Sequence, residues 1–404
     1  MKRPPNEPLF FARFEAARTK LRTVAVTGTN GKTSTTTFIG SVVEQHGPAA
    51  TVTTLGAWVD GSRVPGKGTA EFLATVEGAV KAGVEILAVE MTSKALLGGL
   101  ASRWPAEVAV FTNLTHDHLD LHETAEAYLA AKAQLFLALP KGGTAVLNAD
   151  DPACELLAEV VPSHARILWY GSKPCDLQIV STQANGTGQL MTLAPSQELR
   201  AHGIASSITL RVGGGFQAFN AAAAALASFA LGLDAGAIRV GLGAVGKIDG
   251  RFEVVQQDPC VIVDFAHTPD ALRHVLASAR ALAGEHARLH CVFGCGGDRD
   301  RSKRAPMGAL VDELADVVWL TSDNPRSEDP AQIAADVLAG SLGRAEWHRE
   351  LMRQRAIIRA LENASSSDVV VIAGKGHEAT QEIAGTRHPF VDADEVRRYF
   401  RGEA

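Results

Sequence analysis

A glycine-rich run of polar residues separates an apolar stretch from a helical one near the start of the chain. It reads Thr-Gly-Thr-Asn-Gly-Lys-Thr-Ser over residues 27–34. Glycines let the backbone fold so that N–H groups and the helix N-terminus face an anion. Lys32 adds a point charge, and the Thr33 hydroxyl suits Mg²⁺. We expect this loop to hold the phosphates of ATP. Its residues are Gly28, Thr29, Asn30, Gly31, Lys32, Thr33 and Ser34.

The match to the general phosphate-loop pattern is incomplete. That pattern, G-x-x-x-x-G-K-[ST], requires a glycine where this chain has Val26. A glycine turn followed by a surface lysine is the alternative for this segment taken alone.

Two further groups suit a magnesium-nucleotide site. Glu90 ends a buried apolar run, where an unpaired carboxylate is costly and a metal ion removes the cost. A histidine-rich string, Thr-His-Asp-His-Leu-Asp-Leu-His, follows another apolar run at residues 115–122. Histidines suggest zinc, but hard Mg²⁺ prefers oxygen ligands. A turn of mutually satisfied polar residues is the other interpretation of this string.

The elements that position these groups alternate β-branched runs with helical stretches, a pattern typical of parallel α/β architecture. Serine-, threonine- and glutamine-rich alternation over residues 177–212 predicts an antiparallel patch, and residues 219–231 return to helix. The strands expected before it span residues 21–26, 85–89, 107–111 and 143–147, and the helices span residues 32–45 and 124–137.

A glycine-dense connector at residues 241–246 suggests a domain boundary. Beyond it we expect strands at residues 261–265, 289–293, 317–321 and 369–373 and a helix at 269–282. We therefore predict a P-loop-type parallel-sheet ATP-binding domain over residues 1–248 with a small antiparallel patch. A Rossmann-like α/β domain follows over residues 249–404, and the site is expected in the cleft between them.

Composition indicates a soluble, cytoplasmic protein. The 404 residues are 46% hydrophobic and 21% charged, and the net charge of -6 gives no general attraction to nucleic acid. Residues 1–8 carry charge and prolines rather than a signal peptide, and no segment reaches the roughly 20 apolar residues of a membrane span. The five cysteines form no CxxC pair, so we expect reduced thiols; Cys291 and Cys295 alone make half a metal site at most.

Nine segments along nearly the whole chain resemble the Mur ligase family, and within it the muramoyl-tripeptide synthetases. They occur in family order and cover residues 26 to 378. The segments are VTGTNGKT (26–33), EMTS (90–93), FTNLTHDHLDLH (111–122), YLAAK (128–132), GRFE (250–253), VDFAHTPDAL (263–272), FGCGGDRD (293–300), DNPRSEDP (323–330) and AGKGHE (373–378).

The resemblance implies a ligase that makes an amide bond through an acyl phosphate, with ATP and Mg²⁺. It implies that Lys32 acts in catalysis, that Thr33 and Glu90 hold one metal ion and that His118 holds a second. Lys132 is implied to be carbamylated, which turns a cation into an oxygen-bearing anion that suits the second metal. An ordinary lysine on the surface of a helix is the alternative for Lys132.

The resemblance also implies nucleotide contacts further along the chain. Family members place an amide on adenine near the helix at residue 219, where this sequence has Gln217 and Asn220, with Gln217 in place of the usual asparagine. Arg251, Asp264 and His267 match positions near the ribose and phosphates. A set of salt bridges at a domain edge is the alternative for these three.

The amine side matches the diaminopimelate-adding type. The arginine of the DNPR segment, Arg326, can pair in bidentate fashion with the distal carboxylate of a diaminopimelate-like amino acid, which lysine lacks. Capping the start of a helix is the other role open to residues 323–325. The remaining amino-acid contacts implied are Arg299, Asn324, Gly374 and Glu378.

The acceptor side matches less well. Relatives carry a UDP-binding domain before the phosphate loop, and this sequence has few residues there. Thr92-Ser93-Lys94 replaces the family's Ser-Ser-His step, and His116 replaces an arginine. We therefore expect a carboxylate acceptor other than UDP-MurNAc-dipeptide. The partners expected overall are small-molecule substrates, with no nucleic acid and no membrane.

Two other functions stay open. One is a genuine UDP-N-acetylmuramoyl-tripeptide synthetase to which a partner chain supplies acceptor binding. The other is a non-catalytic nucleotide-binding regulator, which needs no set of metal ligands. A folylpolyglutamate-synthetase role fits the DNPR and GKGHE segments poorly.

Overall fold

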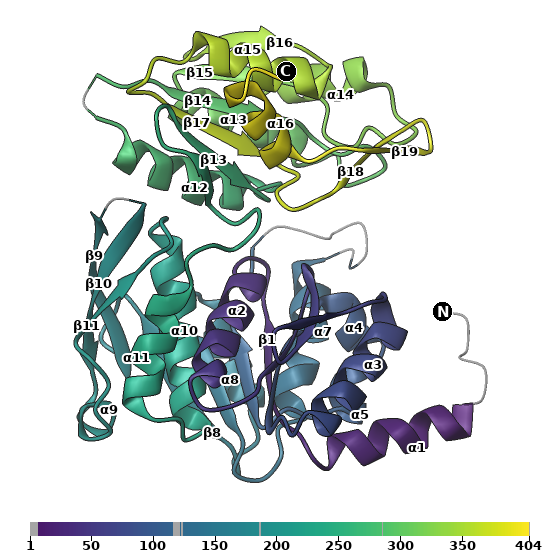
Figure 1. Ribbon diagram of the computed structural model, residues 1–404, viewed down its shortest axis with the longest axis vertical. Coiled ribbons are helices and arrows are strands. Elements are labelled where there is room, and N and C mark those ends of the chain that lie inside the picture. Colours follow the sequence, from purple (N-terminus) through teal and green to yellow (C-terminus); the bar gives the residue numbers. More distant parts are fainter. Residues whose placement is uncertain (1–6, 116–121, 123, 186, 285, 404) are drawn as a thin grey trace.

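Two large β-sheets, each with helices on both faces, form the two lobes of the molecule. The computed structural model describes residues 7–115, 122, 124–185, 187–284 and 286–403. An 11-stranded sheet forms the lower lobe in Figure 1 and a six-stranded sheet forms the upper lobe. The mixed α/β class with a large parallel sheet is confirmed.

The large sheet has the strand order β11-β10-β9-β8-β7-β6-β1-β5-β2-β3-β4. It is parallel from β2 to β9 and antiparallel at both edges. Its strands are β1 (Arg22–Thr27), β2 (Ala50–Thr53), β3 (Gly56–Val59), β4 (Ser62–Val64), β5 (Ile86–Glu90), β6 (Val108–Phe111), β7 (Thr144–Asn148), β8 (Arg166–Gly171), β9 (Leu177–Asn185), β10 (Gly188–Pro195) and β11 (Ser207–Leu210).

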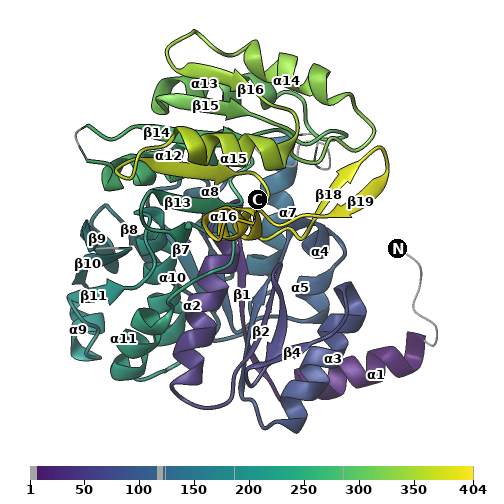
Figure 2. The ribbon, with the colours of Figure 1, turned by 45° about the horizontal axis from the view of Figure 1, so that its top comes forward.

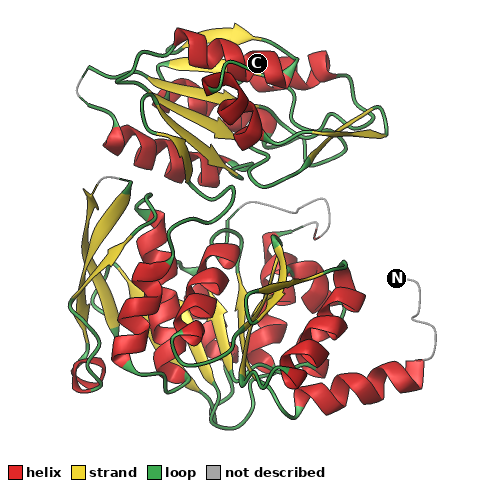
Figure 3. Ribbon diagram, viewed as in Figure 1, coloured by secondary structure: helices red, strands yellow, loops and turns green. Residues whose placement is uncertain are grey.

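Helices cover both faces of this sheet (Figure 3). One hydrophobic core includes side chains of α2, α10 and α11, and the opposite one includes side chains of α3, α7 and α8. The helices of the lobe are α1 (Glu7–Arg18), α2 (Lys32–Glu44), α3 (Gly68–Lys81), α4 (Ser93–Leu97), α5 (Leu100–Arg103), α7 (Ala125–Leu137), α8 (Ala153–Val160), α9 (Gln197–Ala201), α10 (Phe216–Ala230) and α11 (Ala235–Ala244).

The second sheet has the order β12-β13-β17-β14-β15-β16, with only β12 antiparallel. The hairpin β18–β19 projects to one side of it in Figure 2. The strands are β12 (Glu253–Gln256), β13 (Cys260–Asp264), β14 (Leu289–Phe293), β15 (Val317–Leu320), β16 (Glu346–Arg349), β17 (Val369–Ala373), β18 (Thr380–Ile383) and β19 (Thr386–Pro389). The helices are α12 (Pro269–Leu282), α13 (Arg304–Leu314), α14 (Pro330–Leu338), α15 (Arg353–Asn363) and α16 (Asp392–Phe400).

Most elements expected from the sequence lie within a few residues of their predicted bounds. The antiparallel patch is confirmed as β9, β10 and β11, but it extends the large sheet, because β9 also pairs in parallel with β8 through Tyr170 and Leu177. The predicted division at residues 248 and 249 falls between α11 and β12.

The connector predicted at residues 241–246 is wrong over its first four residues, because residues 241–244 belong to α11. Gly241 is needed for close packing rather than for a turn: a Cβ atom there would overlap Val42 and lie 2.7 Å from the Ser41 carbonyl oxygen. The hydroxyl of Ser41 donates to the Gly241 carbonyl at 2.8 Å. The glycine thus brings α11 against α2, the helix that follows the phosphate loop.

The two lobes meet at the phosphate loop. Asn30 Nδ2 donates to Asp270 Oδ2 at the start of α12 over 2.9 Å. Arg251, just before β12, donates from Nη2 to the Thr33 hydroxyl over 3.3 Å. Residues of the second lobe therefore reach the groups expected to bind ATP.

In the described part of the chain, no helix combines the length and the apolar character needed to cross a membrane.

Substituting Gly241 tests the contact between α11 and α2. Gly241→Ala is expected to lower the free energy of unfolding by about 1–3 kcal/mol, because the added methyl group overlaps backbone atoms. Urea unfolding measures the change. The control is Gly47→Ala, where a Cβ meets nothing within 4 Å. Equal stability of the two variants would contradict the packing role.

Candidate active site

The phosphate loop is built around two glycines in the left-handed region. Gly28 has φ 145° and Gly31 has φ 85°. A Cβ atom on Gly28 would overlap the Thr112 hydroxyl, and one on Gly31 would overlap the Asn220 side chain. Both positions therefore require glycine for space as well as for backbone conformation.

The loop rests on the segment that follows β6. The Thr112 hydroxyl donates to the Asn30 carbonyl at 2.6 Å, and the Asn30 N–H donates to Asn113 Oδ1 at 2.8 Å. The Thr29 N–H donates to the Asn113 carbonyl at 2.8 Å. Gly31 then begins α2 without a side-chain cap. The first N–H groups of α2 have no partner within the helix, which makes its N-terminus suited to a phosphate.

A hydroxyl and a carboxylate meet beside this helix start. The Thr33 hydroxyl donates to Glu90 Oε2 at 2.8 Å, and the Thr54 N–H donates to the same oxygen at 3.1 Å. Mg²⁺ takes oxygen ligands and is commonly held by one or two carboxylates together with phosphate and water. Thr33 and Glu90 fit such an ion. Among the described residues no group of three or more histidine, cysteine or acidic side chains gathers as a fuller metal cluster.

Two more residues, His118 and Lys132, were expected at the metal ions, and the structure describes only Lys132. His118 lies outside the described residues. Lys132 is 1% exposed, and its Nζ donates to the Gly28 carbonyl at 2.6 Å and lies 4.2 Å from the centre of the Tyr128 ring. The interpretation of Lys132 as a surface lysine is therefore wrong. Its carbamylation stays a prediction.

The amides expected near adenine lie under the phosphate loop at the start of α10. Gln217 is fully buried, and its Oε1 accepts from Asn220 Nδ2 at 2.9 Å. The Gln217 Nε2 has no partner among the described residues. A hydrogen-bond acceptor on a ligand would satisfy this buried donor.

Three residues of the second lobe were expected at the nucleotide: Arg251, Asp264 and His267. They lie in two neighbouring segments that Asp264 links. Asp264 Oδ2 accepts the Phe252 N–H at 2.6 Å, and its Oδ1 accepts the Ala266 N–H at 2.7 Å. Burial raises the pKa of the Asp264 carboxyl to about 6, although Arg251 and the two N–H groups oppose the rise. Asp264 thus holds the backbone directly after Arg251 and directly before His267.

The ring of Phe265 connects these residues. The Arg251 guanidinium lies 4.5 Å from the ring centre, and the imidazole of His267 lies 4.6 Å from it. The His267 Nδ1 is 2.8 Å from the Phe265 carbonyl. Arg251, which also reaches Thr33, is therefore aimed at the phosphate loop by stacking.

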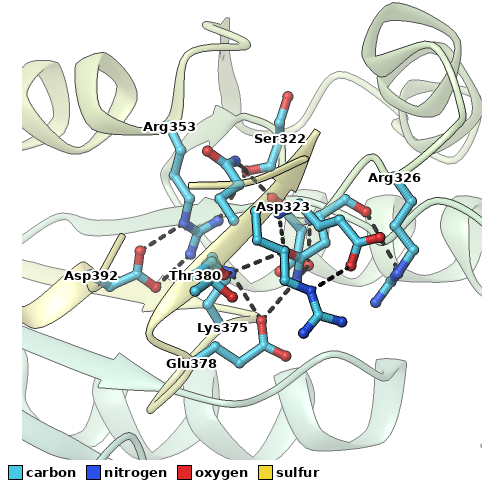
Figure 4. A network of polar contacts seen from close by, with 12 residues as sticks. Ser322, Asp323, Arg326, Arg353, Lys375, Glu378, Thr380 and Asp392 are labelled. Atoms are coloured by element: carbon cyan, nitrogen blue, oxygen red, sulfur yellow. Dashed lines mark hydrogen bonds and ion pairs between the residues drawn. The ribbon is translucent and has the colours of Figure 1, made fainter. Parts of the chain in front are cut away.

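The expected amino-acid contacts gather at the carboxyl ends of β15 and β17, on the two sides of β14 (Figure 4). Asn324 Nδ2 donates to Glu378 Oε2 at 2.8 Å. Gly374, at φ 111°, lies so near Asp323 that a Cβ atom would come within 2.7 Å of Asp323 Oδ2. The structure therefore brings Asn324, Gly374 and Glu378 together.

The two arginines differ. Arg326 has φ 52°, and its Nη1 donates to the Gly297 carbonyl at 2.6 Å. No carboxylate of the described residues pairs with its guanidinium, which suits an arginine that takes a substrate carboxylate. Arg299 is exposed and donates to the Asp298 carbonyl at 3.2 Å, without joining the Asn324 and Glu378 network.

A fully buried arginine supports both loops of this site from behind. Arg353 pairs with Asp392 through two 2.7 Å contacts, and both side chains are 0% exposed. Its Nη2 also donates to the Ala373 carbonyl at 3.0 Å, and its Nη1 lies 3.5 Å from the Ser322 carbonyl. Arg353 thus joins the ends of β15 and β17 (Figure 4).

Both lobes match known families. Residues 26–228 match the Mur ligase middle domain, and residues 250–376 match the Mur ligase, glutamate ligase domain. A protein of Gloeobacter violaceus named UDP-N-acetylmuramoyl-L-alanyl-D-glutamate--2,6-diaminopimelate ligase is 40% identical over 389 residues, which cover 94% of this chain and 77% of that protein. The Aquifex aeolicus protein of the same name is 35% identical, over 95% of this chain and 78% of its own length.

The chain belongs to the Mur ligase family. It is accordingly an ATP-dependent, ADP-forming acid–amino-acid ligase, and the family implies ATP and Mg²⁺. A solved structure of a ligase with the same name as these relatives has a TM-score of 0.64 and 35% identity, covering 95% of this chain and 79% of that chain. Folylpolyglutamate synthase of Mycobacterium tuberculosis, at 21% identity and a TM-score of 0.73 over 98% of this chain and 96% of its own, is similar in fold alone.

Sequence reasoning missed several residues of this Mur ligase that hold the site together. Thr112 and Asn113 support the phosphate loop, and Lys375, Arg353 and Asp392 support the second-lobe loops. A polar pair directly after a buried strand was a signal for Thr112 and Asn113. A lysine between glycines directly after another buried strand was a signal for Lys375. Nothing local marked Arg353, since its partner Asp392 lies 39 residues away.

Removing the Arg353 side chain tests its supporting role. Arg353→Met is expected to lower the free energy of unfolding of this Mur ligase by about 3–5 kcal/mol, because it leaves the Asp392 carboxylate buried and unpaired. Urea unfolding measures the loss. Adding Asp392→Leu to the variant removes the unpaired charge and should recover part of that loss. A double variant no more stable than the single one would contradict this account.

Proposed function

We propose that this Mur ligase joins meso-diaminopimelate to UDP-N-acetylmuramoyl-L-alanyl-D-glutamate. The observation that carries the proposal is the 40% identity over 94% of the chain to a relative named for that reaction. Further relatives of the same name match over 93–95% of the chain. This likeness favours the standard acceptor over the different carboxylate that the substitutions at residues 92–94 and 116 suggested.

The amine side supports diaminopimelate over lysine. The distal end of diaminopimelate carries a carboxylate and an ammonium group, whereas the side chain of lysine ends in an ammonium group alone. Arg326, without a carboxylate partner in the described residues, suits the carboxylate, and Glu378 suits an ammonium group. Asn324 lies between them in the network that holds Glu378.

The phosphate side supports an acyl-phosphate route. The acceptor carboxylate takes the γ-phosphoryl group of ATP and ADP leaves; the amine nitrogen then attacks the acyl carbon, phosphate leaves and the nitrogen gives up a proton. We propose that Lys32 and the N-terminus of α2 hold the transferring phosphate, and that Thr33 and Glu90 hold Mg²⁺. The metal ion supplies positive charge that stabilises the phosphoryl group in transfer.

Further roles complete the proposal. Gln217, Asn220, Arg251, Asp264 and His267 serve the nucleotide. In support, Gln217 Nε2 is a buried donor without a partner among the described residues, and Arg251 bonds to Thr33. Lys132 is proposed to carry the carbamate that, with His118, holds a second metal. We also propose that the domains divide at residues 248 and 249.

Phosphate release tests the function. Purified protein is incubated with ATP, Mg²⁺, UDP-N-acetylmuramoyl-L-alanyl-D-glutamate and one amino acid at a time. We expect release, and a product heavier by one diaminopimelate residue, with meso-diaminopimelate but not with L-lysine or L-glutamate. Reactions without acceptor control for ATP hydrolysis. Turnover only with a different carboxylate acceptor, or only with another amino acid, would overturn the proposal.

Arg326→Lys tests how the amino acid is chosen. A lysine keeps the charge but loses the bidentate pair, so KM for meso-diaminopimelate should rise about tenfold or more while KM for ATP stays the same. Steady-state kinetics measure both constants. Arg344→Lys changes an exposed arginine of the same lobe and serves as the control. An unchanged KM for diaminopimelate would remove Arg326 from the site.

A further inference from the structure

Lys375 is a buried cation in the middle of the proposed amino-acid site. It lies two residues after the end of β17 and is 0% exposed. Its Nζ donates to Glu378 Oε2 at 2.9 Å, to the Thr380 carbonyl at 2.7 Å and to Asn324 Oδ1 at 3.3 Å. An ammonium group has three protons to donate, so this residue is saturated by its own protein. It therefore has no proton left for a substrate.

The bonds of Lys375 fix which way the Asn324 amide faces. Asn324 Oδ1 accepts from Lys375 and from the Glu382 N–H at 2.9 Å. That leaves Nδ2 to donate to Asp323 Oδ1 at 3.0 Å and to Glu378 Oε2 at 2.8 Å. Turned over, the amide would place its N–H groups against the ammonium of Lys375 and its oxygen against two carboxylates. The buried cation therefore selects one orientation.

Glu378 accepts two hydrogen bonds on the same carboxylate oxygen. Lys375 and Asn324 both donate to Oε2, and the residue is only partly buried. Burial raises the pKa of the Glu378 carboxyl, but the charge of Lys375 and the bonds from Lys375 and Asn324 outweigh burial and hold the pKa below its usual value. The carboxylate is thus kept ionised, with its orientation set through Oε2.

We propose that Lys375 is a positioning residue of the ligase. It orients Glu378 and holds it as an anion, so that Glu378 can bind the ammonium group of the incoming amino acid. The identity of that amino acid rests on the proposed function, whereas the dependence of its binding on Lys375 does not. Lys375 itself is assigned no contact with the substrate, because its Nζ donates to three oxygens of the protein.

A purely structural role is the competing explanation. The bond from Lys375 to the Thr380 carbonyl ties the start of β18 to the end of β17, and it alone would stabilise the lobe. Such a role acts through the backbone and does not depend on the charge of Glu378. The two explanations therefore differ in how substitutions at residues 375 and 378 combine.

A double-mutant cycle separates them. Lys375→Met, Glu378→Gln and the double variant are compared with the wild type for kcat, KM of the amino acid and KM of ATP. Lys375→Met is expected to raise KM of the amino acid about 10- to 100-fold, the value of a hydrogen bond to a charged group, with KM of ATP unchanged. The double variant should lie within about threefold of Glu378→Gln, because coupled residues are not additive. Lys173→Met, on the exposed surface of the first lobe, is the control.

Two results would overturn the proposal. Additive effects on KM in the cycle would mean that Lys375 does not act through Glu378, and an unchanged KM in Lys375→Met would mean that it does not act on the amino acid at all. If Lys375→Met alone does not fold, the double variant, which leaves neither charge unpaired, is compared with Glu378→Gln. A double variant that also fails to fold shows a structural role and counts equally against the proposal.

The cycle also separates this inference from the proposed function. A wild type that uses another amino acid would overturn the diaminopimelate assignment, and the cycle is then run with that amino acid. A wild type that uses diaminopimelate, with additive variants, would overturn the role of Lys375 alone.

Discussion

A cation buried away from water has to be compensated by carboxylates or by the oxygens of backbone carbonyls. Fully or almost fully buried cations meet this requirement around the site, among them Lys132, Arg353 and Lys375. Lys132 donates to the Gly28 carbonyl of the phosphate loop, Arg353 to the Ala373 carbonyl at the end of β17, and Lys375 to the Thr380 carbonyl at the start of β18. The backbone at each of these three positions is therefore held by a charge that cannot leave it without a large energetic penalty.

Strand order decides which loops these cations bring together. In the large sheet β1 lies between β5 and β6, and the register pairs Val26 with Glu90 and Thr27 with Phe111. The loop after β1, the carboxylate that ends β5 and the segment after β6 thus meet at one edge, as parallel sheets arrange their sites. In the second sheet β14 separates β15 from β17, so that Asn324 and Glu378 meet across the end of β14.

The apolar runs predicted the strands well because central parallel strands are buried on both faces, as the wholly buried β14 and β17 illustrate. Spacing along the chain could not say what covers a helix. Lys132 lies in an alanine-rich helix whose sequence suits a surface as well as a core, and only the fold places the Gly28 carbonyl over it. The glycines of α11 misled for the same reason, since Gly241 serves a close approach to α2 that no local pattern encodes. The resemblance to the family located Asn324 and Glu378, whereas Arg353 and Asp392 become visible only through their buried contact.

The contact between the lobes involves the same oxygen as the proposed metal site. The Thr33 hydroxyl has one proton, which goes to Glu90, and it accepts the bond from Arg251 with a lone pair. If Thr33 holds Mg²⁺ as proposed, the ion would occupy the second lone pair of this hydroxyl and would repel the guanidinium beside it. The Arg251–Thr33 bond would then be weakened when the metal nucleotide binds. Because Arg251 directly precedes the buried Phe252, whose N–H is held by Asp264, such a change would couple occupancy of the phosphate loop to the second lobe, which carries the proposed amine site.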